Sequence, residues 1–474
     1  MKQRPILISG EWREMSESFE VRAPYGGEVL ATVGSAGPGE TEEAIAAADA
    51  AAKEMRRMPR FETAKGLRRI ADGIERRKEE FVRAIATEAA KPMIYARGEV
   101  ERGIATFSYA SGEAERFAGE MIPVDTQPPG RGKTARTMRV PRGVIYGITP
   151  FNFPLNLVAH KVAPALASGN AIVIKPSPRT PLTSLLLGEV FMESGLPAAA
   201  LQVVPMDVKY MDTVLSDERV SMLSFTGSAA VGWDLKQKAG KRPTCLELGG
   251  NAPVIVDETA DMELSIGRCV TGAFAYSGQV CISVQRVYVH DSLWDDWTAG
   301  FVGGAKSLKV GDPLDEATQL SVMIDEAAAE RAEGWANEAL ANGAEALYRG
   351  EREGAMLRPI VLTNTDPEMK AVSEEVFAPI AVVERFSDFR DAVDMANHGK
   401  YGLQAGVFTR STENARFATE NLEYGGIIIN DAPIFRVDNM PYGGSKESGF
   451  GREGVRYAMD EMTEIRLVVE SFGV

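Results

Sequence analysis

Cysteine and histidine are scarce in this chain, which has three of each among 474 residues. Three cysteines (Cys245, Cys269 and Cys281) cannot build a disulfide framework, and an odd number favours reduced thiols, so we expect a cytoplasmic protein. The three histidines lie far apart in the sequence and no Cys-x-x-Cys pair occurs. We therefore predict no metal site.

Long apolar runs and an excess of positive charge are also missing. No segment approaches the roughly 18–20 apolar residues of a membrane span, and the N-terminus lacks the apolar core of a secretory signal. The net charge is −15, whereas proteins that bind nucleic acid or anionic membranes present basic surfaces. We expect neither a nucleic-acid partner nor a membrane partner.

Apolar runs that read as buried strands alternate with helical segments from residue 143 onward. The runs are GVIYGI, AIVIK, LQVV and MLSF, and a second such unit begins near Gly249 with APVIV, RVYVH, IAVVERF and GVFTR. This alternation predicts parallel sheets covered by helices on both faces. A chain of this length exceeds one core, so we predict an α/β fold with two doubly wound sheets. Thr180 is the predicted N-cap of the helix after AIVIK, with Pro181 at its first position.

Two segments do not fit the alternating pattern. Residues 123–143 are rich in proline, glycine and basic side chains, and we expect an arm or hairpin outside the main sheets. Residues 463–472 read as a late strand with no helix after it, which could pair with another subunit.

Cys281 lies in GQVCISVQR (278–286), between polar neighbours such as Gln279 and Ser283. Most cysteines are small buried hydrophobes, and we assign Cys245 and Cys269 to that class. A partly exposed loop thiol is instead where nucleophiles occur. On local sequence alone, both interpretations of Cys281 stay open.

Two further polar residues stand at the ends of predicted strands. Glu247, in LELGG (246–250), is either a surface glutamate or a buried carboxyl whose raised pKa suits a general base. Asn152, in TPFNFP (149–154), either forms a turn or offers a rigid amide to an oxyanion.

Two other motifs suit a nucleotide. FTGSAAVG (225–232) predicts a helix N-terminus whose N–H groups can meet a pyrophosphate, although the pattern is not G-x-G-x-x-G. Lys175 ends the strand AIVIK and is either a cofactor ligand or a surface lysine with a buried stem.

The ordered set PFNFP, IKPS, FTGSxxVG, ELGG, GQxC, EEVFAP (374–379) and PYGGSKESGFGRE (441–453) resembles the aldehyde dehydrogenase superfamily across nearly the whole chain. Residues 436–454 are similar to the branch that includes lactaldehyde and phosphonoacetaldehyde dehydrogenases. The resemblance implies a cofactor-binding domain (1–122, 143–248 and 429–455), a catalytic domain (249–428) and a small β oligomerisation arm (123–142 and 456–474). It also implies a homodimer or homotetramer.

The resemblance assigns the chemistry of aldehyde oxidation to three residues. Cys281 is the implied nucleophile, Asn152 with the backbone N–H of Cys281 stabilises the oxyanion, and Glu247 activates the water that hydrolyses the thioester. Members that transfer the acyl group to CoA lack this glutamate. A CoA-acylating enzyme and a non-catalytic binding protein remain as alternatives, against which the three intact residues argue.

The implied cofactor is NAD or NADP. By resemblance it is bound by Thr149, Pro150, Lys175, Ser177, Pro178, Gly227, Ser228, Leu248, Glu375 and Phe377. NAD-preferring members often place a glutamate where Pro178 stands, and Arg179 is adjacent, so tolerance of a 2′-phosphate is expected.

The implied substrate is a small aldehyde, and the residues on or near its tunnel are Phe153, Asn156, His160, Val280, Ile282, Arg436 and Tyr442. His160 and Arg436 suggest a polar or anionic substrate. The alternative is that His160 is a satisfied helix residue and Arg436 anchors its loop. A phosphorylated aldehyde, which needs several basic residues such as Arg436 and Arg102, is a further alternative.

Overall fold

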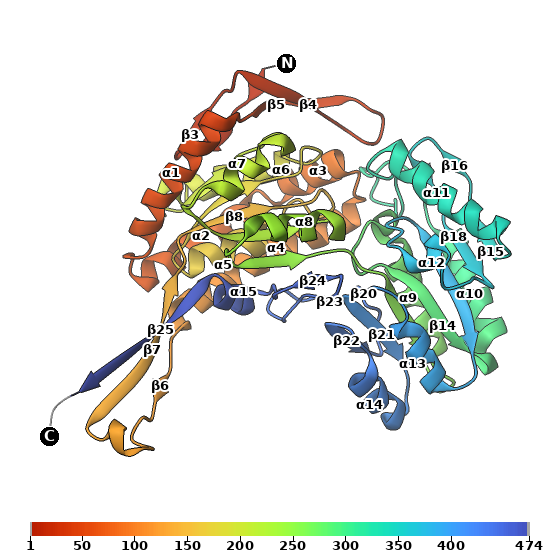
Figure 1. The fold of residues 1–474 in the computed structure, drawn as a ribbon. Helices are drawn as coiled ribbons and strands as arrows, with labels where there is room; N and C mark the ends of the chain where they lie inside the picture. Colours follow the sequence, from red (N-terminus) through yellow and green to blue (C-terminus); the bar gives the residue numbers. More distant parts are fainter. Residues whose placement is uncertain (1, 472–474) are drawn as a thin grey trace.

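The computed structural model describes residues 2–471, which form two large β-sheets with helices packed on them and a small sheet that projects from one side (Figure 1). The predicted α/β fold with two wound sheets and a small β arm is confirmed. Both large sheets also carry antiparallel edge strands, which the sequence did not predict. Residue 1 of the predicted cofactor domain and residues 472–474 of the predicted arm lie outside the described residues.

The first sheet combines the N-terminal half of the chain with a strand from near its C-terminus. In spatial order it contains β24 (Gly449–Phe450), β12 (Thr244–Glu247), β11 (Val220–Thr226), β8 (Val144–Ile148), β9 (Ala171–Lys175), β10 (Leu201–Val203), β2 (Ile6–Ile8) and β3 (Glu11–Arg13). The helices of this half are α1 (Pro38–Met55), α2 (Arg60–Arg76), α3 (Lys78–Ala89), α4 (Met93–Arg116), α5 (Asn156–Ala167), α6 (Leu182–Met192), α7 (Met211–Ser216), α8 (Ala229–Ala239) and α15 (Val455–Glu461). A small N-terminal sheet contains β1 (Gln3–Arg4), β5 (Val29–Ser35) and β4 (Glu17–Arg22).

The second sheet comes from the middle and later part of the chain. In order it contains β15 (Glu345–Arg349), β18 (Ile360–Thr363), β19 (Ile380–Phe386), β14 (Val284–His290), β13 (Ala252–Val256), β21 (Gln404–Phe408) and β22 (Gly426–Ile429). Its helices are α9 (Met262–Phe274), α10 (Trp294–Ser307), α11 (Glu326–Ala341), α12 (Lys370–Ser373), α13 (Phe389–Asn397) and α14 (Thr412–Asn421). Two short pairs of strands lie outside the large sheets. They are β16 (Arg352–Glu353) with β17 (Met356–Leu357) and β20 (Tyr401–Gly402) with β23 (Ser445–Lys446). None of the helices within residues 2–471 is long and apolar enough to cross a membrane.

Four parallel strands of the first sheet end at the same edge. Ile148 of β8 pairs with Lys175 of β9 and with Phe225 of β11, and Thr226 pairs with Glu247 of β12. Because the strands are parallel and in register, the loops that follow them meet at one edge, where α/β sheets bind ligands.

The second sheet presents the opposite ends of its strands to this edge. Cys281 precedes β14 and Glu375 precedes β19, so both lie at amino ends. The pair Gly249–Gly250 follows β12, and β13 begins two residues later at Ala252. The chain therefore passes directly from the carboxyl edge of the first sheet to the amino edge of the second.

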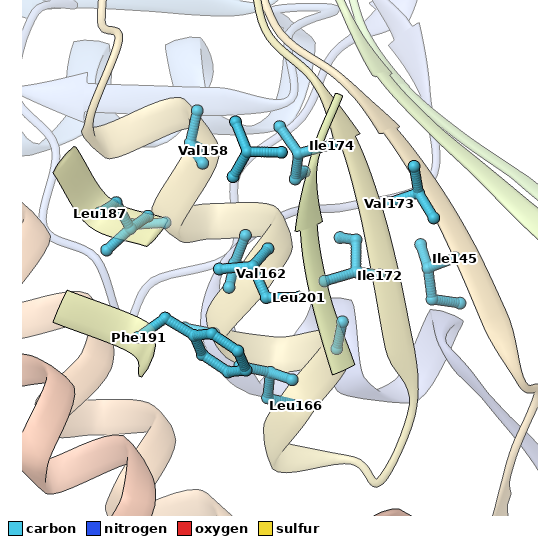
Figure 2. Packing of buried hydrophobic residues seen from close by; sticks show 14 of the residues in the cluster. Ile145, Val158, Val162, Leu166, Ile172, Val173, Ile174, Leu187, Phe191 and Leu201 are labelled. Carbon is cyan, nitrogen blue, oxygen red and sulfur yellow. The ribbon is translucent and has the colours of Figure 1, made fainter. Parts of the chain in front are cut away.

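The core of the first half fixes helix α5. Figure 2 shows Val158, Val162 and Leu166, four residues apart on α5, lying against Ile172 and Ile174 of β9. Each such side chain contributes about 1.5–3 kcal/mol when fully buried. Close packing on this side holds α5 rigid. Other residues of α5 reach the site.

The start of α6 differs from the prediction that Thr180 caps it. Pro181 is the N-cap, and the buried carboxylate of Glu88, in α3, accepts hydrogen bonds from the backbone N–H groups of Leu182 (2.8 Å) and Thr183 (2.9 Å). An acceptor from another helix thus satisfies the first N–H groups, as a local cap otherwise would. The prediction of Thr180 as N-cap was wrong because this partner is distant in sequence.

The projecting sheet contains β25 (Thr463–Ser471), β7 (Lys133–Pro141) and β6 (Met121–Ile122), and is drawn at the lower left of Figure 1. The late strand pairs antiparallel with β7 of its own chain along its whole length. Helix α15 falls within the segment predicted as arm except for its first residue, Val455, yet its Met459 packs into the core of the first sheet. The described arm is therefore the three strands without this helix.

Candidate active site

The turn before Cys281 has an uncommon backbone conformation. Tyr276 and Ser277 have φ values of 50° and 55°, in the left-handed region that costs non-glycine residues roughly 1–2 kcal/mol each. The Tyr276 hydroxyl donates to the carbonyl of Ala89 (3.0 Å) and the Ser277 hydroxyl to that of Ser321 (2.6 Å). These bonds hold the turn, which presents Cys281 partly exposed at the start of β14.

The two glycines after Glu247 allow the two sheets to meet closely. A Cβ on Gly249 would lie 2.5 Å from the carboxylate of Glu375, and one on Gly250 would lie 2.1 Å from the backbone oxygen of Cys281. Gly250 also donates its N–H to Glu375 at 2.9 Å. Gly250 does not accept a side chain, and one on Gly249 would displace the Glu375 carboxylate, so the pair lets the segment after β12 lie against the Cys281 loop.

Two cavities meet at Cys281, which lines both of them. Cavity A has a volume of about 220 Å³ and is lined by six of the seven predicted tunnel residues: Phe153, Asn156, Val280, Ile282, Arg436 and Tyr442. Cavity B has a volume of about 320 Å³ and is lined by six of the ten predicted cofactor residues: Pro150, Gly227, Ser228, Leu248, Glu375 and Phe377. Molecules in the two cavities can therefore both approach Cys281.

The remaining predicted cofactor residues lie outside cavity B. They are Thr149, which follows β8, Lys175, which ends β9, and Ser177 and Pro178, which follow β9 at the same sheet edge. Arg179, expected beside a 2′-phosphate, forms an ion pair with Asp325 at 2.6 Å. Its charge is thus already balanced, which weakens the charge argument for NADP.

Asn152 also lines cavity B and is tied to the cysteine loop. Its side-chain Nδ2 donates a hydrogen bond to the carbonyl of Gln279 at 2.9 Å. An amide nitrogen has two hydrogens, so the second is left for another acceptor. The bond fixes the orientation that an oxyanion donor needs.

Glu247 is buried and its carboxyl group has no partner. Both oxygens lack hydrogen-bond partners within the described residues. Burial, and then the charge of nearby Glu453, raise the pKa of Glu247 well above its usual range. Burial therefore favours the protonated form of the carboxyl group, which once ionised is an unsolvated and hence strong base.

His160 does not line cavity A, unlike the prediction. It is buried in α5, and its Nε2 lies 2.8 Å from the carboxylate of Asp438. Burial is the main cause that lowers its pKa, so the ring is neutral. The alternative of a satisfied helix histidine describes the Nε2 atom, whereas the buried Nδ1 atom has no hydrogen-bond partner within residues 2–471. The position of His160 differs from the prediction because burial disfavours its charged form and because Asp438, distant in sequence, is its hydrogen-bond partner.

Asp438 is the residue of this region that the sequence analysis missed. Besides His160 it accepts hydrogen bonds from Asn156 (3.2 Å) and from two nitrogens of Arg102 (2.8 and 3.2 Å). These partners hold the pKa of Asp438 well below its usual range despite burial. Arg102, which lines cavity A, therefore faces it as half of an ion pair.

Arg436 and Tyr442 form a stack beside the nucleophile. The Arg436 guanidinium lies 3.6 Å from the centre of the Tyr442 ring, and the Tyr442 hydroxyl lies 3.0 Å from the sulfur of Cys281. Arg436 also contacts Glu453 at 3.3 Å, which in turn binds Lys161 at 3.0 Å. The buried Nε of Arg436 has no hydrogen-bond partner in the part of the chain that the structure describes.

Cavity B suits a nicotinamide dinucleotide. Ser228 stands at the N-cap of α8 without making a capping bond, which leaves the helix N-terminus open to a phosphate. Phe151 and Phe377 meet edge to face at 6.0 Å, and burial raises the pKa of Glu375 to about 7. Arg331, which no motif marked, also lines the cavity. Within residues 2–471 no cluster of metal-binding side chains occurs.

Comparisons with known proteins agree with this geometry. Residues 12–468 match the aldehyde dehydrogenase family. The chain is 40% identical over 470 residues to the 3-sulfolactaldehyde dehydrogenase of Priestia megaterium, covering 99% of this chain and 98% of that one. The structure of aldehyde dehydrogenase 21 from Physcomitrella patens with the reaction product succinate is 42% identical, with a TM-score of 0.97 over 99% of this chain and 98% of that one.

A second solved structure carries a cofactor. It is glyceraldehyde-3-phosphate dehydrogenase from Methanocaldococcus jannaschii complexed with NADP, 38% identical, with a TM-score of 0.92 over 96% of this chain and 100% of that one. The resemblance seen in the motifs is thus confirmed over almost the whole length. The chain belongs to the aldehyde dehydrogenase family and is an NAD- or NADP-dependent oxidoreductase of small aldehydes.

Proposed function

We propose that the protein oxidises a short aldehyde bearing one negative charge to the carboxylic acid, with Cys281 as nucleophile. The observation that carries the proposal is that Cys281 lines both cavities. An aldehyde in cavity A and a nicotinamide ring in cavity B then flank the same sulfur, as hydride transfer from a covalent adduct requires.

The residues around the sulfur supply the steps of this reaction. The Cys281 thiolate attacks the aldehyde carbon, and the carbonyl electron pair moves to oxygen, which accepts the free Nδ2 hydrogen of Asn152. A nicotinamide cofactor, which residues of cavity B such as Ser228 and Glu375 would hold, would supply the acceptor for the hydride that leaves this carbon. Glu247, as carboxylate, takes a proton from the water that hydrolyses the resulting thioester.

The charges that face cavity A favour one anionic group on the substrate. Arg102 is balanced by Asp438, whereas Arg436 and Lys161 share one carboxylate, that of Glu453. One positive charge is left over on Arg436, whose buried Nε has no hydrogen-bond partner among the described residues. A carboxylate or sulfonate matches this charge better than a doubly charged phosphate does.

The names of the relatives agree with a singly charged substrate. The Priestia enzyme is a dehydrogenase of 3-sulfolactaldehyde, which carries a sulfonate, and the Physcomitrella structure holds succinate. The Methanocaldococcus enzyme is a dehydrogenase of a phosphorylated aldehyde, which keeps that alternative as an outcome of the test below.

Replacing Arg436 with methionine tests the charge preference. We expect wild-type protein to oxidise succinate semialdehyde with a higher kcat/KM than butanal, and Arg436→Met to lower the ratio of the two values by about 10- to 100-fold. The measurement is the initial rate of reduced nicotinamide formation with NAD and with NADP. Arg410→Met removes the same charge from an exposed position outside both cavities and serves as control. A preference for butanal contradicts the proposal, and a preference for glyceraldehyde 3-phosphate favours the phosphorylated alternative.

We also propose that the arm joins copies of this chain. Ile465, Leu467 and Val469 alternate along β25 and are half or more exposed, and β25 is the edge strand of its sheet. An apolar edge strand of this kind is an unpaired template for a second chain.

The arm proposal predicts that Leu467→Asp lowers the mass of the particle in solution. A charge in an apolar interface costs several kcal/mol, on the order of the free energy that holds a modest assembly together. Light scattering coupled to size exclusion measures the mass. Arg466→Asp places the same group on the neighbouring residue of the strand, whose side chain points to the other face, and is expected to keep the wild-type mass. A wild-type protein with the mass of one chain contradicts the proposal.

A further inference from the structure

The only side-chain hydrogen bond of Cys281 within residues 2–471 comes from a phenol. The Tyr442 hydroxyl lies 3.0 Å from the sulfur, and either atom can be the donor in the neutral pair. Once Cys281 ionises, only the phenol carries a hydrogen, so the bond then runs from oxygen to sulfur.

Tyr442 is held rigidly in this position. It is buried, its backbone exchanges hydrogen bonds with Glu453 (3.0 and 2.7 Å), and its ring lies under the guanidinium of Arg436. The raised pKa of Tyr442, mainly caused by burial, keeps the phenol protonated. The adjacent cation polarises its O–H group and makes it a better donor.

Reactive thiolates usually face a helix N-terminus, an imidazolium or a cationic Lys or Arg side chain. Of these, the charge of Arg436 lowers the pKa of Cys281. Cys281 precedes the strand β14, and His160 is neutral, bound to Asp438 and outside cavity A. Burial raises the pKa of the Cys281 thiol to about 11, and the bond to Tyr442 acts in the opposite direction.

We propose that the Tyr442 hydroxyl donates a hydrogen bond to the Cys281 thiolate and is a catalytic residue that maintains the nucleophile in its reactive form. The proposal rests on the assignment of Cys281 as nucleophile. The thiol proton passes to water, and the phenol keeps its own proton throughout. When the sulfur lone pair forms the bond to the aldehyde carbon, the hydrogen bond weakens and the carbonyl pair moves to oxygen.

The test is the pH dependence of Cys281 alkylation by iodoacetamide, without aldehyde or cofactor. In this reaction the thiolate forms a sulfur–carbon bond and iodide leaves. For Tyr442→Phe we expect the apparent pKa to rise by about one unit, so that alkylation near pH 8 slows about tenfold. Mass spectrometry of the Cys281 peptide distinguishes this thiol from the buried Cys245 and Cys269.

Tyr95→Phe is the matched control, because Tyr95 also lines cavity A and its hydroxyl makes no hydrogen bond to the sulfur of Cys281. It is expected to leave the alkylation pKa unchanged. Arg436→Met, which removes the polarising cation, is expected to raise that pKa as well. If the alkylation pKa of Cys281 is unchanged or lower in Tyr442→Phe, the proposal is overturned, since the phenol then accepts a hydrogen bond from the thiol or makes none. The alkylation experiment uses no aldehyde, so its result is independent of turnover. Turnover that survives in Cys281→Ala would instead contradict the assignment of Cys281 as nucleophile.

Discussion

Cys281→Ala is expected to abolish aldehyde oxidation, lowering kcat by about 10⁴- to 10⁶-fold. The reaction needs a nucleophile that an aldehyde and a nicotinamide ring can both reach, and Cys281 lies at the junction of the two cavities. Cys245 is buried at the start of β12 and Cys269 inside α9, so neither can replace it. The measurement is the initial rate of reduced nicotinamide formation over a panel of short aldehydes, with NAD and with NADP.

Cys269→Ala is the matched control, since it removes a thiol from the core of the second half and leaves both cavities intact. It is expected to keep the wild-type rate. Turnover of Cys281→Ala at a rate near wild type contradicts the assigned nucleophile. If wild-type protein itself reduces neither cofactor until CoA is added, the CoA-acylating alternative replaces hydrolysis. If it remains inactive with CoA, the non-catalytic alternative is favoured.

Glu247→Gln is expected to lower steady-state turnover by about 10²- to 10⁴-fold, the range that a general base contributes. The reason is that attack and hydride transfer need Cys281, whereas only hydrolysis needs the carboxylate. The first turnover therefore persists, and stopped-flow absorbance is expected to show a burst of one reduced nicotinamide per site. The mass of the intact protein then increases by that of the acyl group. Loss of the burst together with turnover contradicts the assignment, because Glu247 then acts before hydride transfer.

The raised pKa of Glu247 gives this variant a second signature in its pH profile. The base is the carboxylate, so hydrolysis in wild-type protein increases as the pH rises towards that pKa, and the increase is expected to be missing in Glu247→Gln. The unfolded chain ionises this glutamate near pH 4.3. Since the folded state resists ionisation, stability is lost as the pH rises above that value. Glu247→Gln is therefore expected to have a Tm at pH 8 at least as high as that of wild type.

The site residues that the motifs marked share a local feature. Glu247 and Asn152 are polar groups at the ends of apolar strands, and Cys281 is a cysteine among polar neighbours, so each stands out within its own few residues. The structure places Cys281 and Asn152 on the wall of cavity B and buries Glu247 without a partner. Their catalytic roles remain predictions until the variants above are measured.

Contacts between distant segments were not predictable in the same way. Asp438 lies 278 residues from His160, in a loop with no periodic pattern. It nevertheless contacts that histidine, which does not line cavity A. Glu88 caps a helix 95 residues later, in place of the local Thr180. In both cases the partner is a buried carboxylate. A buried carboxylate needs hydrogen-bond donors, and the fold supplies them from segments that are distant in sequence.

The sequence by itself determined the α/β class, the family and the loops that carry the chemistry, because apolar periodicity and glycine-rich turns are encoded locally. Only the tertiary structure decided that the carboxyl edge of one sheet meets the amino edge of the other. It also decided that Tyr442 contacts the Cys281 sulfur, and that Arg436 has a buried nitrogen without a partner. Desolvation and charge depend on what surrounds a side chain in space, and chain order does not specify those neighbours.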